Sequence, residues 1–394
     1  MRVTGYGYPW DVLDAPGFAD RAGQLGIDEV AVAVSYHSTR AATPYAPGST
    51  SVAARHAAFY RPVRERAWQG ARLRPASPEW VTGEDSAGAA VHALTAAGVP
   101  AAAWLVLTHN SRLGLAHPDV TVRNCFGEHY PWALCPSRAE VRDFAATLAT
   151  EALDGLAVSS VVLEACGQLG AIHQCEHEKT DAVWGPAAAR LLSVCCCSAC
   201  AARWTESGAD PAEVRSRLRA EVRALIDGGD LARAEDELPP ALAELLLRTR
   251  QASTDALRRG VLAAASAAVG GARIVLHGAV DPWTTGALPG LTPTAPAQVD
   301  SVVLQCWQPG PASVASVAAA HGRVPAGTGV GAYVTAVAAA PVADFAGYVT
   351  ELGRAGADEL HLYHLGLAGP ARQPDLAAAV TAAHQLTSAA PARG

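Results

Sequence analysis

Three short apolar runs follow one another near the end of the chain: SVVLQC (residues 301–306), VGAYVT (330–335) and ELHLY (359–363). Each run is rich in β-branched, leucine or aromatic side chains and is short enough to form a strand. Two alanine-rich segments, 312–320 and 342–355, lie between the runs and have the spacing of helices. Strands that alternate with helices predict a parallel sheet, because a parallel connection needs a crossover.

Five similar runs precede this segment, so the strand–helix unit recurs along the whole chain. We expect these strands at residues 3–8, 29–36, 101–108, 160–164 and 273–277, and further helices at 86–97, 137–153 and 376–386. Eight parallel strands close a (β/α)8 barrel. The predicted fold class is therefore α/β, with residues 1–394 forming a single TIM-barrel domain. A doubly wound open sheet is the alternative, but the GYGYP segment of the first strand is not the G-x-G-x-x-G motif of dinucleotide binding.

Composition excludes several classes of function. The 394 residues are 50% hydrophobic and carry a net charge of −7, which argues against a disordered chain and against a nucleic-acid partner. The longest apolar stretch, 99–107, is far shorter than the roughly 20 residues of a membrane span. No basic segment leads into an apolar run at the start. We therefore expect a soluble, cytoplasmic protein without a membrane partner that acts on a small molecule, with a homo-oligomer and a monomer as the open alternatives.

Two connections are longer than the barrel needs. The first, residues 38–85, contains strand-like pieces at 58–62 and 71–75 and is predicted to form a hairpin flap. The second, residues 166–271, lies between the fourth and fifth strands and holds a cluster of cysteines. Leucine and alanine recur at helical spacing in its segments 211–227 and 238–269, which predicts an antiparallel helical arm beside a Cys-rich zinc lobe.

The cysteine pattern points to a metal. Eight of the nine cysteines fall in the middle of the chain, and three of them form the motif Cys195-x-Cys197-x-x-Cys200. Three thiolates at this spacing can hold one tetrahedral zinc, with a fourth ligand from elsewhere. Cys135, just before a predicted helix, is the first choice; Cys125, Cys175 and His177 are the alternatives. Four cysteine ligands would make the zinc structural, whereas the competing interpretation is a buried, inert Cys-rich helix.

Polar and aromatic side chains gather where the predicted strands end, and active sites of TIM barrels lie at those C-terminal ends. Aromatic rings that stack on sugar faces, beside groups that bind hydroxyls, would suit a sugar. The predicted catalytic residues are Glu164, Asp281, His277, Lys179 and His109. The predicted substrate-binding residues are Tyr8, Trp10, His37, Asn110, His173, His177, Trp307, Tyr333, Tyr363 and His364. A structural, hydrogen-bonded role is the competing interpretation for each histidine.

The segment IHQCEHEK (172–179) has two further interpretations. His173 and His177 are four residues apart, so on a helix they would share one face. With Glu164 or Glu178 they could bind a second, catalytic metal, or they could line the pocket beside Lys179, the only lysine of the chain. A solvated surface loop is the alternative.

Several of these motifs together resemble one family. Cys135-Pro136-Ser137, a strand ending in Glu164, and Cys195-x-Cys197-x-x-Cys200 followed by Trp204 look like the zinc-containing β-galactosidases of glycoside hydrolase family forty-two and related clan A barrels. The resemblance covers about a quarter of the chain. It implies that Cys135, Cys195, Cys197 and Cys200 bind zinc and that Glu164 is the catalytic acid/base.

The sequence departs from that family at two positions. Leu163 stands where the family has asparagine, and residues 331–335 offer no carboxylate where the family has its nucleophile at the end of strand seven. Glycoside hydrolysis generally uses two carboxyl groups, and Asp281 is the nearest replacement. We expect a glycoside hydrolase-like enzyme with Glu164 as acid/base. The alternatives are a sugar or cyclitol lyase or isomerase that uses Lys179 or a histidine as base, and a non-catalytic sugar-binding barrel.

Overall fold

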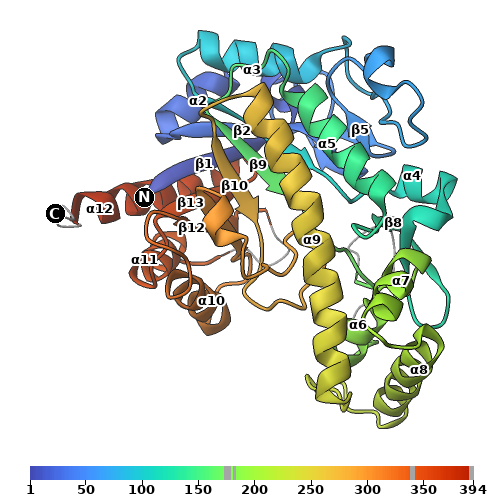
Figure 1. Cartoon of the computed structure of the whole chain (residues 1–394). Helices are drawn as coiled ribbons and strands as arrows, with labels where there is room; N and C mark the ends of the chain where they lie inside the picture. Colours follow the sequence, from blue (N-terminus) through green and yellow to red (C-terminus); the bar gives the residue numbers. More distant parts are fainter. Residues whose placement is uncertain (173–178, 181–182, 338–341, 390–394) are drawn as a thin grey trace.

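The computed structural model describes residues 1–172, 179–180, 183–337 and 342–389, and its centre is a closed parallel barrel (Figure 1). Each strand pairs in parallel with the next, and β1 pairs with both β2 and β13, which closes the ring. The eight strands are β1 (Arg2–Gly7), β2 (Glu29–Tyr36), β6 (Ala101–Val106), β9 (Ser160–Glu164), β10 (Arg273–His277), β11 (Ser301–Gln305), β12 (Gly329–Thr335) and β13 (Glu359–Tyr363). The predicted TIM barrel is confirmed, and all eight strands were placed correctly.

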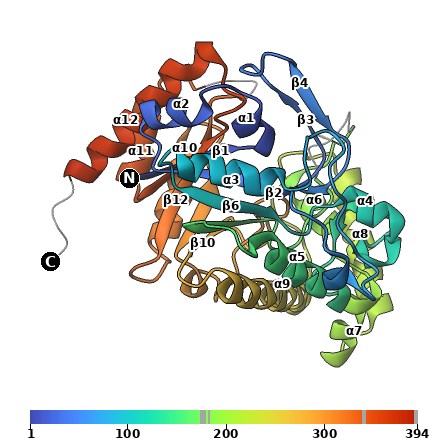
Figure 2. The same ribbon diagram turned by 90° about the horizontal axis from the view of Figure 1, so that it is seen from above.

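Helices surround the barrel, as Figure 2 shows from above. They are α1 (Pro9–Leu13), α2 (Phe18–Leu25), α3 (Ser86–Ala96), α5 (Ala139–Leu153), α9 (Pro240–Ala268), α10 (Pro311–His321), α11 (Phe345–Arg354) and α12 (Gln373–Ala389), with 3-10 turns at Pro296–Gln298 and Pro370–Arg372. Helix α5 packs along α9, and α11 packs along α12. The connection from β10 to β11 contains only the 3-10 turn at Pro296–Gln298, so this loop lies at the rim without a covering helix.

Several polar side chains point into the barrel. Strand residues alternate between the two faces of a sheet, and three strands carry pairs of polar groups two or four positions apart, and therefore on one face: Ser160 and Glu164 on β9, Arg273 and His277 on β10, Glu359 and His361 on β13. The Tyr6 ring of β1 lies 4.9 Å from the Trp104 ring of β6 and 5.8 Å from the His277 ring of β10. Because these strands are not neighbours, the contacts place the three side chains in the interior.

The first insertion contains a hairpin at a position that differs from the prediction. Strands β3 (Thr39–Ala42) and β4 (Ser51–Ala54) pair in antiparallel register and lie at the upper right of Figure 2. The prediction of strands at 58–62 and 71–75 was wrong in detail: only β5 (Ala58–Phe59) forms, and it pairs with the end of β2. The rest of the insertion holds a 3-10 turn at Glu65–Trp68. Strand formation here follows pairing with neighbours rather than local propensity.

The second insertion and the segment that connects β6 to α5 form a lobe beside the barrel (Figure 1). It contains α4 (Ser111–Ala116), the 3-10 turn Pro118–Val120, the hairpin of β7 (Thr121–Arg123) and β8 (His129–Leu134), and the helices α6 (Pro186–Leu192), α7 (Ser198–Glu206) and α8 (Pro211–Asp227). Both predicted arm helices exist, but the antiparallel pairing was wrong. Helix α8 packs on α6 and α7, whereas α9 packs on α5 and runs down to the lobe.

None of the helices in the described part of the chain combines the length and the hydropathy that crossing a membrane would require.

Candidate functional site

Glu164 is the last residue of β9 and lies at the C-terminal rim of the barrel. Only 4% of its surface is exposed. Trp104 of β6 donates a hydrogen bond from its indole Nε1 to Glu164 Oε2 over 2.8 Å. His277, the last residue of β10, places its Nδ1 3.5 Å from the same oxygen. The neighbouring strands thus fix this carboxyl group in one orientation, which is a property of catalytic groups in preorganised sites.

Glu164 forms part of the wall of a cleft of about 400 Å³, a volume within the range of small-molecule sites. Aromatic residues from four strand ends share this wall: Tyr36, Trp307, Tyr333 and Tyr363. The rings of Trp307 and Tyr363 lie 5.0 Å apart, and those of Trp307 and Tyr333 5.8 Å apart. Burial raises the pKa of Tyr333 and Tyr363, so both hydroxyls stay protonated at neutral pH. The structure thus brings predicted residues together into a surface that can stack on a sugar ring.

Two predicted histidines, His37 and His109, also line the cleft and stack on each other with ring centres 4.3 Å apart. His37 Nδ1 lies 2.7 Å from the carbonyl oxygen of Ser38. The carbonyl can only accept, so this nitrogen carries the proton and Nε2 is left as an acceptor. Burial lowers the pKa of His37, although the nearby Glu164 opposes this effect. His37 is therefore a neutral imidazole that can take up a proton.

Four predicted binding residues lie behind this wall or support it. Tyr8 is buried, and its hydroxyl lies 3.3 Å from that of Tyr363. Trp10 stacks on Tyr8 at 4.4 Å, and the ring of His364 lies 4.3 Å from Tyr8 on another side. Asn110 accepts a hydrogen bond from the Leu113 N–H and caps α4. These residues position the cleft wall and are not among the residues that line it.

The remaining candidates are not brought to the cleft in the described part of the structure. Asp281 is exposed and accepts hydrogen bonds from the Trp283 N–H and the Thr284 hydroxyl, so it shapes its own turn. Lys179 is exposed and is not among the cleft residues. His173 and His177 lie outside the described residues. Among the described residues that line the cleft, Glu164 is therefore the single carboxylate.

Sequence reasoning did not assign a role to several side chains that the structure places beside Glu164 or in the cleft. Trp104 stands within an alanine-rich strand, and its indole donor meets Glu164 only because β6 and β9 are neighbours. Gln305 and the loop residues Thr284 and Thr285 also line the cleft. The position of Gln305 at the end of the β11 run was the available signal, whereas nothing in the local sequence marked Thr284 or Thr285.

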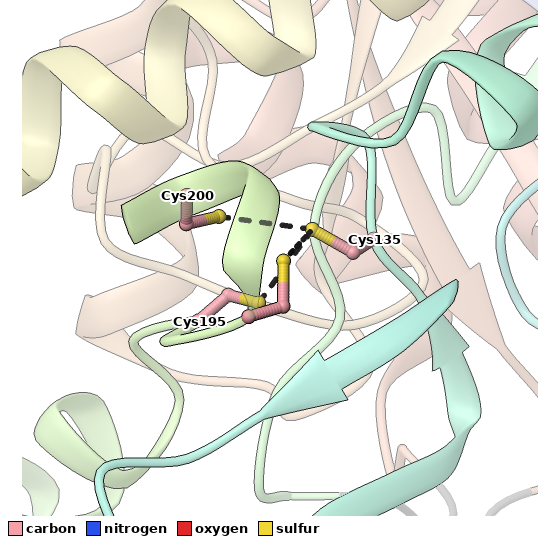
Figure 3. Close-up of side chains that lie close together, drawn as sticks. Cys135, Cys195 and Cys200 are labelled. Carbon is pink, nitrogen blue, oxygen red and sulfur yellow. Dashed lines mark hydrogen bonds between the residues drawn. The ribbon is translucent and has the colours of Figure 1, made fainter. Parts of the chain in front are cut away.

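The four predicted cysteine ligands converge in the lobe, as Figure 3 shows for the three that it labels. Cys135 follows β8, Cys195 and Cys197 precede α7, and Cys200 lies in the first turn of α7. All four are buried, and their sulfur atoms lie within 4.8 Å of one another. The Sγ of Cys135 is 3.5 Å from that of Cys195 and 3.8 Å from those of Cys197 and Cys200.

These distances fit a tetrahedral metal site. A zinc–sulfur bond of about 2.3 Å gives sulfur–sulfur edges of about 3.8 Å in a regular tetrahedron. They are much too long for a disulfide, whose sulfur atoms are about 2.05 Å apart. Cys125, the alternative fourth ligand, is buried but not part of the cluster. The four thiols can therefore hold one metal ion, and the interpretation as an inert Cys-rich helix does not account for Cys135 joining them from a different segment.

Known structures share this fold. No family model and no curated protein matches the sequence. The structure is similar to a β-galactosidase from the psychrophilic Marinomonas ef1 (TM-score 0.57, 13% identity, covering 98% of this chain and 60% of that one). It is also similar to a β-galactosidase from the Antarctic haloarchaeon Halorubrum lacusprofundi (0.59, 12%, 99% and 58%). A third similar structure is the catalytic domain of a β-amylase from Paenibacillus polymyxa (0.57, 12%, 99% of both chains). The chain thus spans about 60% of the length of the two β-galactosidases, and what it shares with all three is the barrel fold.

Proposed function

We propose that this protein is a glycoside hydrolase-like enzyme that acts on a polyhydroxylated small molecule, with Glu164 as its general acid/base. The observation that carries the proposal is the position of Glu164: a buried carboxyl group, oriented by Trp104, in the wall of an aromatic-lined cleft at the C-terminal end of a TIM barrel. Active sites of this fold lie at that end. The similar structures that are β-galactosidases or a β-amylase agree with a carbohydrate substrate.

The residues of the cleft take three roles in this proposal: a general acid, a general base and a surface that binds the substrate. Glu164 donates a proton to the oxygen of the leaving group, which is the role of the general acid in glycoside cleavage. Neutral His37, on the same cleft wall, accepts a proton at Nε2 from water or from a substrate hydroxyl. Trp307, Tyr333 and Tyr363 stack on the substrate, and Gln305 binds a hydroxyl.

The second candidate is a sugar or cyclitol lyase or isomerase. It is favoured by one observation, the presence of a single carboxylate among the described residues of the cleft, because an elimination or isomerisation needs one acid and one base rather than two carboxyls. His37 or His109 would be the base in that reaction, since Lys179 is not among the cleft residues. An isomerase would incorporate deuterium from heavy water at a carbon position of its product, and a lyase would lose a carbon-bound hydrogen and form a double bond, whereas hydrolysis leaves the carbon-bound hydrogens unchanged.

The experiment that tests the proposed function compares Glu164→Gln with Glu151→Gln on a panel of chromogenic glycosides. Glu164→Gln keeps the shape and the Trp104 contact but cannot supply a proton, so we expect a loss of about 10²- to 10⁴-fold in kcat. Glu151 is the matched control, a buried glutamate that pairs with Arg64 outside the barrel and should leave activity unchanged. Full activity of Glu164→Gln would refute the catalytic role and leave a sugar-binding barrel as the better interpretation.

We further propose that the four cysteines hold a structural zinc ion. Their number, their burial and their sulfur–sulfur distances support this assignment. Four protein ligands leave no position for water, so the ion would serve the fold rather than the reaction. The Ser137 hydroxyl lies 3.1 Å from Cys200 Sγ and 2.7 Å from the Ser253 hydroxyl of α9, which ties the cluster to the long helix.

A further inference from the structure

A continuous row of buried polar groups passes through the barrel from Glu164 to its opposite end. His277 lies between Glu164 and Tyr6, with its Nδ1 3.5 Å from Glu164 Oε2 and its Nε2 2.8 Å from the Tyr6 hydroxyl. The Tyr6 hydroxyl lies 3.0 Å from His361 Nδ1, and His361 Nε2 lies 3.2 Å from Glu359 Oε2. Glu359, the first residue of β13, also pairs with Arg273. Tyr6, His277 and His361 are at most 1% exposed.

The charged end of the row sets the direction of its hydrogen bonds. Burial raises the pKa of Glu359, but the hydrogen bond and the charge interaction with His361, together with the charge of Arg273, outweigh it and lower this pKa to about 2. Glu359 is thus ionised and can only accept, so His361 carries a proton on Nε2. When Nε2 holds the single proton of His361, its Nδ1 is an acceptor and receives the proton of the Tyr6 hydroxyl.

The same logic continues to the catalytic end. The Tyr6 oxygen, having donated its proton to His361, accepts from His277 and therefore requires a proton on His277 Nε2. His277 Nδ1 is then unprotonated, buried and without a hydrogen-bond partner, and it faces Glu164 Oε2. Burial lowers the pKa of His277, although Glu164 opposes this effect. A lone pair that faces a carboxylate oxygen repels it, whereas the same lone pair accepts a proton from a carboxylic acid.

We propose that Glu164, His277, Tyr6, His361 and Glu359 form an internal proton relay, which keeps Glu164 in its acid form and can take up its proton. The proposal rests on the proposed function, since it explains how one carboxyl group serves as both acid and base. His277, Tyr6 and His361 are positioning residues, because they act on the substrate only through Glu164.

The transfer of charge through the row is balanced. The Glu164 O–H bond breaks as a proton moves to His277 Nδ1, the His277 Nε2 proton moves to the Tyr6 oxygen, and the Tyr6 proton moves to His361 Nδ1. Glu164 ends as a carboxylate and His361 as an imidazolium, and the number of protons in the row is unchanged. Ionised Glu359 stabilises the imidazolium at 3.2 Å. Other ionisable groups near the row are His37, Tyr36, Tyr333 and Tyr363 around Glu164, Glu29 near Tyr6, and Asp358 beside Glu359.

The relay can be tested without a substrate, by infrared spectroscopy of the protein alone. The C=O stretch of a protonated carboxyl group is distinct from that of a carboxylate, and its loss in Glu164→Gln assigns the Glu164 band. We expect this band in the wild type at neutral pH. Tyr6→Phe should abolish it, because His277 Nε2 loses its acceptor, and a proton on Nδ1 instead stabilises the Glu164 carboxylate. Glu359→Gln should weaken it, because the amide can donate as well as accept and no longer fixes the direction of the hydrogen bonds in the row.

Tyr348→Phe is the matched control, since this buried tyrosine donates to the Cys306 carbonyl outside the row and should leave the band unchanged. Absence of the band in the wild type, or its survival in Tyr6→Phe, would overturn the relay. If Tyr6→Phe does not fold, nitrogen-15 NMR of the wild type decides: both His277 and His361 should carry their proton on Nε2, and a proton on Nδ1 of either refutes the proposal. If the spectra contradict the relay but Glu164→Gln is inactive, only the relay is refuted and the proposed function stands. If the spectra agree with the relay but Glu164→Gln keeps its activity, only the proposed function is refuted.

Discussion

If the four cysteines hold a zinc ion as proposed, replacing Cys135 with serine should release it and destabilise the lobe. Cys135 supplies one of four sulfurs, and it is the only one of the four that comes from outside the segment 195–200. Structural zinc sites contribute about 10–16 kcal/mol of apparent binding free energy, so the loss of one thiolate in four costs roughly 3–4 kcal/mol. Zinc affinity should therefore fall by about two to three orders of magnitude, since each 1.4 kcal/mol is a factor of ten.

Elemental analysis and thermal unfolding measure both effects. Wild-type protein should hold one zinc per chain after dialysis against a weak chelator, and Cys135→Ser should hold much less and unfold at a lower temperature. Cys125→Ser is the control, because Cys125 is equally buried but lies outside the cluster. The reasoning fails if Cys135→Ser retains its zinc, or if purified wild-type protein contains none.

Two further predictions concern Gly331 of β12 and Asp11 of α1. A Cβ added at Gly331 would lie 2.8 Å from both His361 and Val303, so Gly331→Ala should cost about 1–3 kcal/mol in urea unfolding, while Gly23→Ala, with open space around it, should not destabilise the protein. Burial raises the pKa of Asp11 from 3.8 to about 7, so the folded state binds this proton more tightly than the unfolded chain does. Asp11 should therefore make stability fall by up to roughly 4 kcal/mol as the pH rises from 4 to beyond 7. In Asp11→Asn this contribution should vanish, and denaturant unfolding at several pH values would disprove the reasoning if the two proteins showed the same pH dependence.

The cysteine cluster was predictable because its signal is local. Three of its members lie within six residues, and the chemistry of thiolates leaves few uses for such spacing. The position of Asp281 in the folded protein was not predictable in the same way. Its position in the chain suggested a carboxylate near Glu164, but hydrogen bonds from Trp283 and Thr284 hold it in an exposed turn. Such a turn depends on the conformation of the whole loop, which the pattern of hydrophobic residues does not record.

The sequence by itself determined the barrel and the rim at which the candidate site residues lie. Eight buried runs separated by crossovers leave few ways to pair, and the residue that ends each run must lie at the rim. Tertiary structure alone decided which side chains meet inside: Trp104 reaches Glu164, and Tyr6 reaches both His277 and His361. The physical reason is that these contacts join residues 60 to 355 positions apart in the chain, so they depend on barrel closure and strand register. Neither of these is encoded in any single segment.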